Sequence, residues 1–317
     1  MLNMKTIPFS FRQMMALLLG GLLFATTSCK KDENPTPTPA LKTIAEIVST
    51  DANFSLLKQA VDGAGLGMAL SSTGSLTVFA PDNAAFAASG ITSADISDLT
   101  QEELVELLTY HVIGAKISSS GVPATDTVNS LLGPNLYVSR NNNGVFVNGI
   151  KVKTADVNAS NGVIHVISEV IEEIPDETIA DIVIADPANF STLLAAVIKA
   201  ELAELLDAKG KYTVFAPTNA AFEAEGLTSV INDPTTPASA VAAIVKAHVI
   251  GTNVFAGDLI QDNTLETLQN GVTLTIKTMP AASVKITGSS MAPSLITSAD
   301  IVATNGVIHV INKVLLP

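Results

Sequence analysis

The sequence is poor in basic residues, in aromatic residues and in cysteine. Its 317 residues include 17 lysines and arginines against 30 acidic residues, which gives a net charge of -13. Arginine occurs only as Arg12 and Arg140, and tryptophan is absent. Binding to nucleic acids requires a basic surface and commonly uses aromatic stacking. The composition therefore excludes DNA and RNA from the expected partners.

The single cysteine, Cys29, excludes an internal disulfide and follows a short apolar run, Met14 to Phe24. A membrane-spanning helix needs about 20 apolar residues, so this shorter run is typical of a secretory signal peptide. The segment LFATTSC resembles a bacterial lipoprotein signal, in which cleavage frees the cysteine for lipid attachment. We expect residues 1–28 to be the signal and Cys29 to carry the lipid. The alternative is a plain signal peptide with an incidental thiol.

Residues 29–40 form an expected proline-rich stalk. Pro35, Pro37 and Pro39 alternate with threonine, a pattern that favours an extended backbone. The segment Lys30 to Glu33 resembles the surface-export signal of lipoproteins in some Gram-negative bacteria. Because an acidic chain is repelled by anionic headgroups, we expect attachment to the membrane through the lipid anchor only. The expected location is the cell envelope, anchored to the outer membrane and exposed at the surface.

The rest of the chain is a tandem duplication. Two motifs occur twice in the same order: TVFAPDNAAF (77–86) with TVFAPTNAAF (213–222), and NGVIHVI (161–167) with NGVIHVI (305–311). Recurrence at this separation indicates two copies of one structural unit. We therefore predict two similar domains, at residues 41–175 and 176–317.

Local signals in each repeat favour helices first and strands later. Thr100 and Glu103 form a capping box that opens a helix. Leu136 to Arg140 and Val145 to Val147 alternate as strands around an asparagine-rich turn. The predicted fold class is α+β, with helices packed on a mostly antiparallel sheet.

In this order and spacing, the motifs TVFAPxNAAF, HVIG and ADxxAxNGVIHVI resemble those of fasciclin-like domains, present here twice. The resemblance covers nearly all of the chain after the stalk. It implies that each repeat is a mostly antiparallel β-wedge with flanking helices. It also implies an extracellular adhesion or interaction role and does not imply an enzyme.

All four histidines are duplicated between the repeats. His111 and His248 end an apolar stripe on a predicted helix, whereas His165 and His309 lie between aliphatic residues in a predicted strand. A buried imidazole needs a hydrogen-bond partner, so we expect four neutral core histidines. None has the local spacing of a zinc site. We expect no metal, no cofactor and no catalytic residue, because motifs of hydrolases, metalloproteases and phosphate-binding loops are also missing.

The candidate partner-binding residues come from the family resemblance. Asp156-Val157 and Asp300-Ile301 match the Asp-Ile position of the adhesive peptide in animal fasciclin-like matrix proteins that bind integrins. Tyr110-His111 resembles the family's Tyr-His motif, which becomes Ala247-His248 in the second repeat. The alternative for Asp156 and Asp300 is a turn that leads into the last hairpin.

Two hypotheses on function lead at this point, and an enzyme with a site assembled between the two domains is placed last. The favoured hypothesis is a lipid-anchored, non-enzymatic adhesion protein that binds an extracellular protein or polysaccharide. The alternative is a glycan-capture lipoprotein of a nutrient-uptake system. Sugar recognition usually needs exposed aromatic rings, and the chain has only three tyrosines, Tyr110, Tyr137 and Tyr212. Their exposure therefore distinguishes the two hypotheses.

Overall fold

The computed structural model describes residues 40–172, 174–278, 282–287, 289 and 291–317. The expected signal peptide, Cys29 and all but the last residue of the expected stalk lie outside the described residues. Ala40 to Pro317 form one compact unit. No helix in the described ranges is long and apolar enough to cross a membrane.

The first repeat begins with helices and ends with strands. Its helices are α1 (Ile44–Thr50), α2 (Ser55–Ala64), α3 (Asn83–Ala88), α4 (Ser93–Asp98) and α5 (Gln101–Tyr110), with short 3-10 turns η1 (Ala52–Phe54), η2 (Ala69–Ser71) and η3 (Ser119–Gly121). Its strands are β1 (Leu76–Pro81), β2 (Val112–Ile113), β3 (Thr125–Asn129), β4 (Asn135–Asn141), β5 (Gly144–Val147), β6 (Ile150–Ala159) and β7 (Gly162–Ile167).

The second repeat follows the same plan. Its helices are α6 (Ile179–Ala185), α7 (Pro187–Lys199), α8 (Ala203–Asp207), α9 (Asn219–Ala224), α10 (Leu227–Asn232) and α11 (Ala238–Ala247), with the 3-10 turn η4 (Ala256–Asp258). Its strands are β8 (Tyr212–Pro217), β9 (Val249–Ile250), β10 (Thr264–Glu266), β11 (Thr273–Lys277), β12 (Ser283–Ile286), β13 (Ser294–Ala303) and β14 (Gly306–Ile311).

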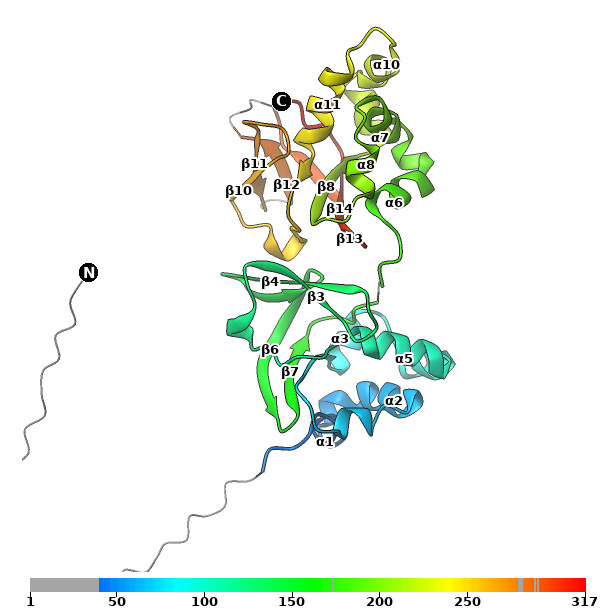
Figure 1. Cartoon of the computed structure of the whole chain (residues 1–317), viewed down its shortest axis with the longest axis vertical. Helices are drawn as coiled ribbons and strands as arrows, with labels where there is room; N and C mark the ends of the chain where they lie inside the picture. Colours follow the sequence, from blue (N-terminus) through cyan, green and yellow to red (C-terminus); the bar gives the residue numbers. More distant parts are fainter. Residues whose placement is uncertain (1–39, 173, 279–281, 288, 290) are drawn as a thin grey trace, which may run out of the picture. The chain divides into compact units, whose positions relative to one another are not determined.

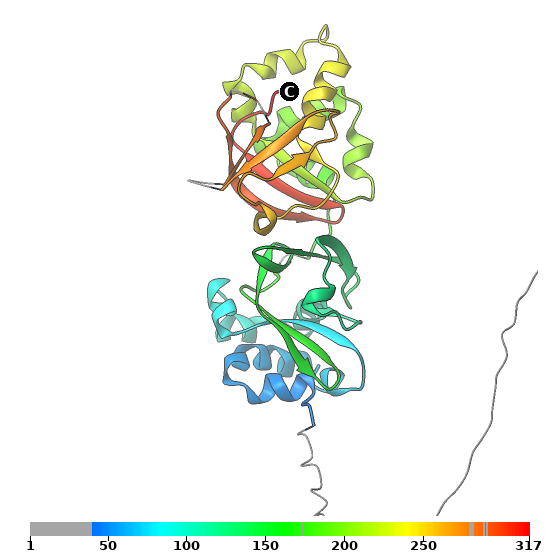
Figure 2. The same ribbon diagram turned by 90° about the vertical axis from the view of Figure 1, so that its left-hand side faces the viewer.

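The two sheets have the same strand order. In the described part of the chain, the first sheet runs β2-β1-β7-β6-β5-β4-β3, and the second runs β9-β8-β14-β13-β12-β11-β10. All neighbouring strands pair antiparallel except β1 with β7 and β8 with β14, which are parallel. The helices of each repeat gather on one side of its sheet (Figures 1 and 2). The predicted α+β class with mostly antiparallel sheets is confirmed.

Several local predictions are also confirmed. Thr100 accepts a hydrogen bond from the Glu103 N–H, and the Glu103 carboxylate accepts one from the Thr100 N–H, which completes the capping box of α5. Strands β4 and β5 pair antiparallel across the asparagine-rich turn. Pro81 is the last residue of β1 and pairs with Ile167.

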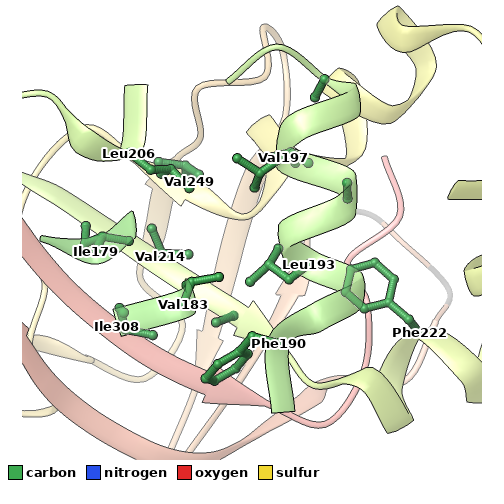
Figure 3. Close-up of a cluster of buried hydrophobic side chains, with 14 of the residues drawn as sticks. Ile179, Val183, Phe190, Leu193, Val197, Leu206, Val214, Phe222, Val249 and Ile308 are labelled. Carbon is green, nitrogen blue, oxygen red and sulfur yellow. The ribbon is translucent and has the colours of Figure 1, made fainter. Parts of the chain in front are cut away.

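The main core of each repeat lies between helices and sheet. In the second repeat, Phe190, Leu193 and Val197 recur on one face of α7 and point toward Val214 and Ile308 of the sheet (Figure 3). The spacing of three and four residues places such side chains on one helical stripe. The first repeat has the same arrangement, with α2 covering β1 and β7.

Candidate partner-binding site

Asp156 lies at an irregularity within strand β6, not in a turn. The pairing of β6 with β7 shifts register between Thr154 and Val157, and Asp156 has a left-handed backbone with φ 61°. Its carboxylate accepts hydrogen bonds from the N–H and the hydroxyl of Ser119 in η3. These two bonds lower the pKa of Asp156. The alternative of a turn into the last hairpin is therefore wrong, because the residue forms a bulge that holds η3 against the strand.

Asp300 repeats this geometry in strand β13. Its φ is 60°, and its Oδ1 accepts a 2.7 Å hydrogen bond from the Ala256 N–H in η4. Its surroundings differ, because a Cβ placed on Gly149 of the first repeat would lie 2.6 Å from Asp300 Oδ2. A polar cavity of about 570 Å³ adjoins this point and is lined by residues of both repeats, including Lys151, Glu169 and Asp300. The two aspartates therefore share a backbone geometry but differ in their surroundings, because Asp300 lies against a residue of the other repeat.

Val157 and Ile301, the residues after the two aspartates, pack against the main cores of their repeats. Both are half-buried. An adhesive contact at these positions would therefore involve the aspartate and only part of the following aliphatic side chain.

His165 and His309 lie beneath the two bulges. The Nδ1 of His165 accepts a 3.2 Å hydrogen bond from the Asp156 N–H, and its Nε2 donates to the Ile117 carbonyl at 2.8 Å. His309 bonds in the same way to the Asp300 N–H and the Val254 carbonyl. His309 is neutral in this arrangement, because its Nδ1 accepts a hydrogen bond and so carries no proton. Burial lowers the pKa of His309 to about 4.

His111 and His248 cap the ends of helices α5 and α11. The Nδ1 of each ring donates to the carbonyl four residues earlier, at 2.8 Å in both cases. Each Nε2 accepts a backbone N–H from the closing segment of its repeat, Ile171 for His111 and Leu315 for His248. Burial lowers both pKa values to about 4. All four imidazoles thus connect backbone segments that are distant in sequence.

Tyr110 is fully buried and His111 is 3% exposed. The Tyr110 hydroxyl donates to the Asn135 carbonyl and accepts from Asn148 Nδ2. These two members of the expected Tyr-His motif are therefore part of the core, and a partner at the surface of the folded chain does not reach them.

The other two tyrosines are also withdrawn from solvent. Tyr137 is 2% exposed, and Tyr212 is half-buried and packs against the core of the second repeat. The exposed large apolar side chains among the described residues are leucine, isoleucine, valine and methionine. No tyrosine in the described ranges is therefore available as an exposed platform for sugars.

The residues that join the two repeats were not named by the sequence analysis, although the short connection at residues 174–177 predicts that the repeats touch. The Tyr137 hydroxyl donates a 2.8 Å hydrogen bond to the Ala303 carbonyl, and its ring lies 5.6 Å from that of Phe255. Asp258 accepts from Ser139 Oγ and from Asn141 Nδ2. Burial raises the pKa of Asp258, although these hydrogen bonds oppose the shift. No local pattern marks these residues, because each bonds to a residue more than a hundred positions away.

No group of three or more histidine, cysteine, aspartate or glutamate side chains in the described ranges is arranged to hold a metal ion. Each histidine ring nitrogen is already bonded to a backbone group. The site residues are therefore arranged for hydrogen bonding within the fold.

Comparison with known proteins identifies the family. The fasciclin domain model matches residues 52–173 and 188–317. The transforming growth factor-beta-induced protein ig-h3 of Sus scrofa is 32% identical over 251 residues, which cover 77% of this chain and 35% of that protein. Protein sll1483 of Synechocystis is 43% identical over 136 residues, covering 42% of this chain and 75% of that protein. The chain thus spans about a third of the length of its animal relative.

A solved FAS1 domain pair from the insect cell adhesion molecule fasciclin I aligns with 83% of this chain and 96% of its own, at 19% identity and a TM-score of 0.42. The family model covers most of the chain, and the bacterial relative is matched over three quarters of its length. With two copies of the domain, this chain belongs to the fasciclin family.

Proposed function

We propose that the protein is a lipid-anchored adhesion protein of the outer membrane that binds an extracellular protein through its fasciclin domains. The observation that carries the proposal is the pair of fasciclin domains, which accounts for most of the described chain. Fasciclin domains occur in cell adhesion proteins, of which the insect fasciclin I is one. The lipoprotein signal at Cys29 supports attachment to the cell envelope.

A protein partner is favoured over a polysaccharide. Sugar rings are commonly bound by stacking on exposed aromatic side chains, and Tyr110 and Tyr137 are almost fully buried. Tyr212 packs against its own core. The same observation argues against glycan capture for a nutrient-uptake system.

A non-enzymatic role is supported by the state of the histidines. A general base needs an accepting atom within reach of a substrate proton. The accepting nitrogens of His165 and His309 are each bonded to an aspartate N–H, and those of His111 and His248 to the closing segments. These imidazoles serve the fold in our proposal.

We place the partner contact at the Asp156-Val157 bulge of the first repeat. Asp156 is half-buried, and it bonds to Ser119 and His165 within its own repeat. Asp300 instead abuts Gly149 of the other repeat. The Asp156 carboxylate is anionic at neutral pH because its pKa is lowered, so it suits a basic or hydrogen-bond-donating group of the partner.

The test combines location with binding. Intact cells are treated with protease, and we expect cleavage of the protein without permeabilisation. Cleavage only after the outer membrane is permeabilised would contradict surface exposure. The purified chain is then tested for capture by immobilised extracellular matrix proteins, with binding by wild type as the expected result.

Two variants separate a binding role of Asp156 from a structural one. Asp156→Asn removes the charge, whereas Ser119→Ala removes a hydrogen bond to the carboxylate but keeps the charge. We expect Asp156→Asn to weaken capture and Ser119→Ala to retain it. Equal capture by Asp156→Asn and wild type would refute the placement of the contact at this bulge.

A further inference from the structure

The first repeat contains an apolar cavity that the proposed adhesion function does not use. Its volume is about 160 Å³, and it lies between helices α2 and α5, strand β1 and the segment 66–74. Val61, Val78 and Leu108 form part of its buried wall. Ser72, Thr73 and Gly74 also line it and are exposed, so the cavity opens to solvent beside them.

The lining selects against charge. Among the described residues that line the cavity, none is acidic, lysine or arginine. His111 also contributes, but both of its ring nitrogens are bonded to backbone groups. The remaining polar side chains are the hydroxyls of Ser72, Thr73 and Thr109. Burying a charged group without a partner is costly, so a ligand of this cavity is neutral and mostly apolar.

The second repeat has the same fold but larger side chains at two equivalent positions. Tyr212 occupies the position of Leu76 at the start of the strand, and Leu205 that of Ala69. The Tyr212 side chain packs against the core of its own repeat. Larger side chains at these two positions would leave less room at the equivalent place in the second repeat.

Apolar surface continues beyond the cavity mouth. Leu131 lines the cavity and is 53% exposed. Met68 is 87% exposed, and in the sequence it stands between Leu66 and Ala69, which both line the cavity. A ligand longer than the cavity would therefore continue over apolar side chains.

We propose that the cavity of the first repeat binds the end of a neutral aliphatic chain. The volume is close to that of a dry apolar cavity of about 150 Å³ that accommodates benzene in another protein. A chain end fits this depth, while Leu131 and Met68 contact the next methylene groups. The chain belongs either to a free alcohol or to an uncharged lipid, which share this chemistry.

The test titrates 1-octanol into the purified chain and follows the methyl NMR signals of Leu57 and Val61, which both line the cavity. We expect saturable shifts with wild type. Leu76→Tyr introduces the second repeat's own residue and should weaken binding about tenfold for every two methylene groups that it excludes. Ala69→Leu also narrows the cavity with a residue of the second repeat, and it replaces Leu76→Tyr if that variant does not fold. These two substitutions are the filling variants.

Octanoate at pH 7.5 provides the control for charge and should bind more weakly than 1-octanol. Cosedimentation with phosphatidylcholine vesicles distinguishes a lipid from a free alcohol as the source of the aliphatic chain. Binding to vesicles that is lost in the filling variant indicates a lipid chain, whereas saturable octanol binding without cosedimentation indicates a free ligand. Identical octanol titrations of wild type and both filling variants, or equal affinity for octanoate, would overturn the proposal.

Discussion

Lowering the pH from 7.5 to 5.5 should destabilise the folded chain, because three buried histidines must stay neutral. The pKa values of His111, His248 and His309 are lowered to about 4, whereas an unfolded histidine titrates near 6.5. Between these values the unfolded chain binds more protons than the folded chain. The free energy of unfolding therefore falls as the pH falls.

The size of the effect follows from the two pKa values. At pH 5.5 the unfolded imidazole is mostly protonated and the folded one is not, so each histidine lowers the free energy of unfolding by about 1 kcal/mol relative to pH 7.5. The three together amount to about 3–4 kcal/mol. Carboxylates with lowered pKa values, such as Asp126 and Asp156, lose their contribution only at lower pH.

Urea denaturation at both pH values measures this difference directly. In His248→Gln one titrating group is missing, so the loss between pH 7.5 and 5.5 should shrink by about a third, although this variant is less stable at both pH values. Lys209→Gln, at an exposed position of the same repeat, should show the full loss. Asp258, whose raised pKa works in the opposite direction, is present in all three proteins.

A free energy of unfolding that is the same at both pH values would refute the reasoning. So would a His248→Gln protein with the undiminished loss. Either result would mean that the imidazole concerned titrates alike in the folded and unfolded chains.

Two further predictions concern packing and the repeat junction. Gly162→Ala should lower the free energy of unfolding by about 2–3 kcal/mol, because its Cβ would lie 2.2 Å from the Leu76 carbonyl oxygen. The matched control in urea denaturation is Gly67→Ala, which has open space around it. Equal effects of the two substitutions would contradict the close approach at Gly162. Tyr137→Phe should lower the free energy of unfolding by about 1 kcal/mol, because it removes the hydrogen bond to the Ala303 carbonyl. An unchanged melting temperature would show that this contact between the repeats does not stabilise the fold.

Local structure was predictable because its signals lie within a few residues. The capping box at Thr100 and Glu103 and the hairpin of β4 and β5 depend on neighbours in the chain. The parallel pairing of β1 with β7 was not predictable in this way, because paired residues such as Leu76 and Gly162 lie far apart in the sequence. The repeated motifs therefore revealed the duplication and the fold class but not this parallel pair.

In the candidate site, too, the sequence showed local motifs but not contacts between distant residues. Asp156 and Asp300 were identified by motif, but a sequence cannot show that a strand shifts register around them. That shift coincides with an N–H donated to a histidine nine residues later. The burial of Tyr110 could not be seen in the sequence, because its hydrogen-bond partners, Asn135 and Asn148, lie elsewhere in the chain. The open volume beside Leu76 likewise depends on side-chain size at positions far apart.

The parallel pair next to one edge of each sheet bears on the order of folding. As the chain is made from its amino terminus, β1 is available long before β7, and β8 long before β14. Neither sheet can close until the last strand of its repeat is present, and such long-range pairing is intrinsically slow to form. The topology thus ties completion of each sheet to the carboxyl end of its repeat.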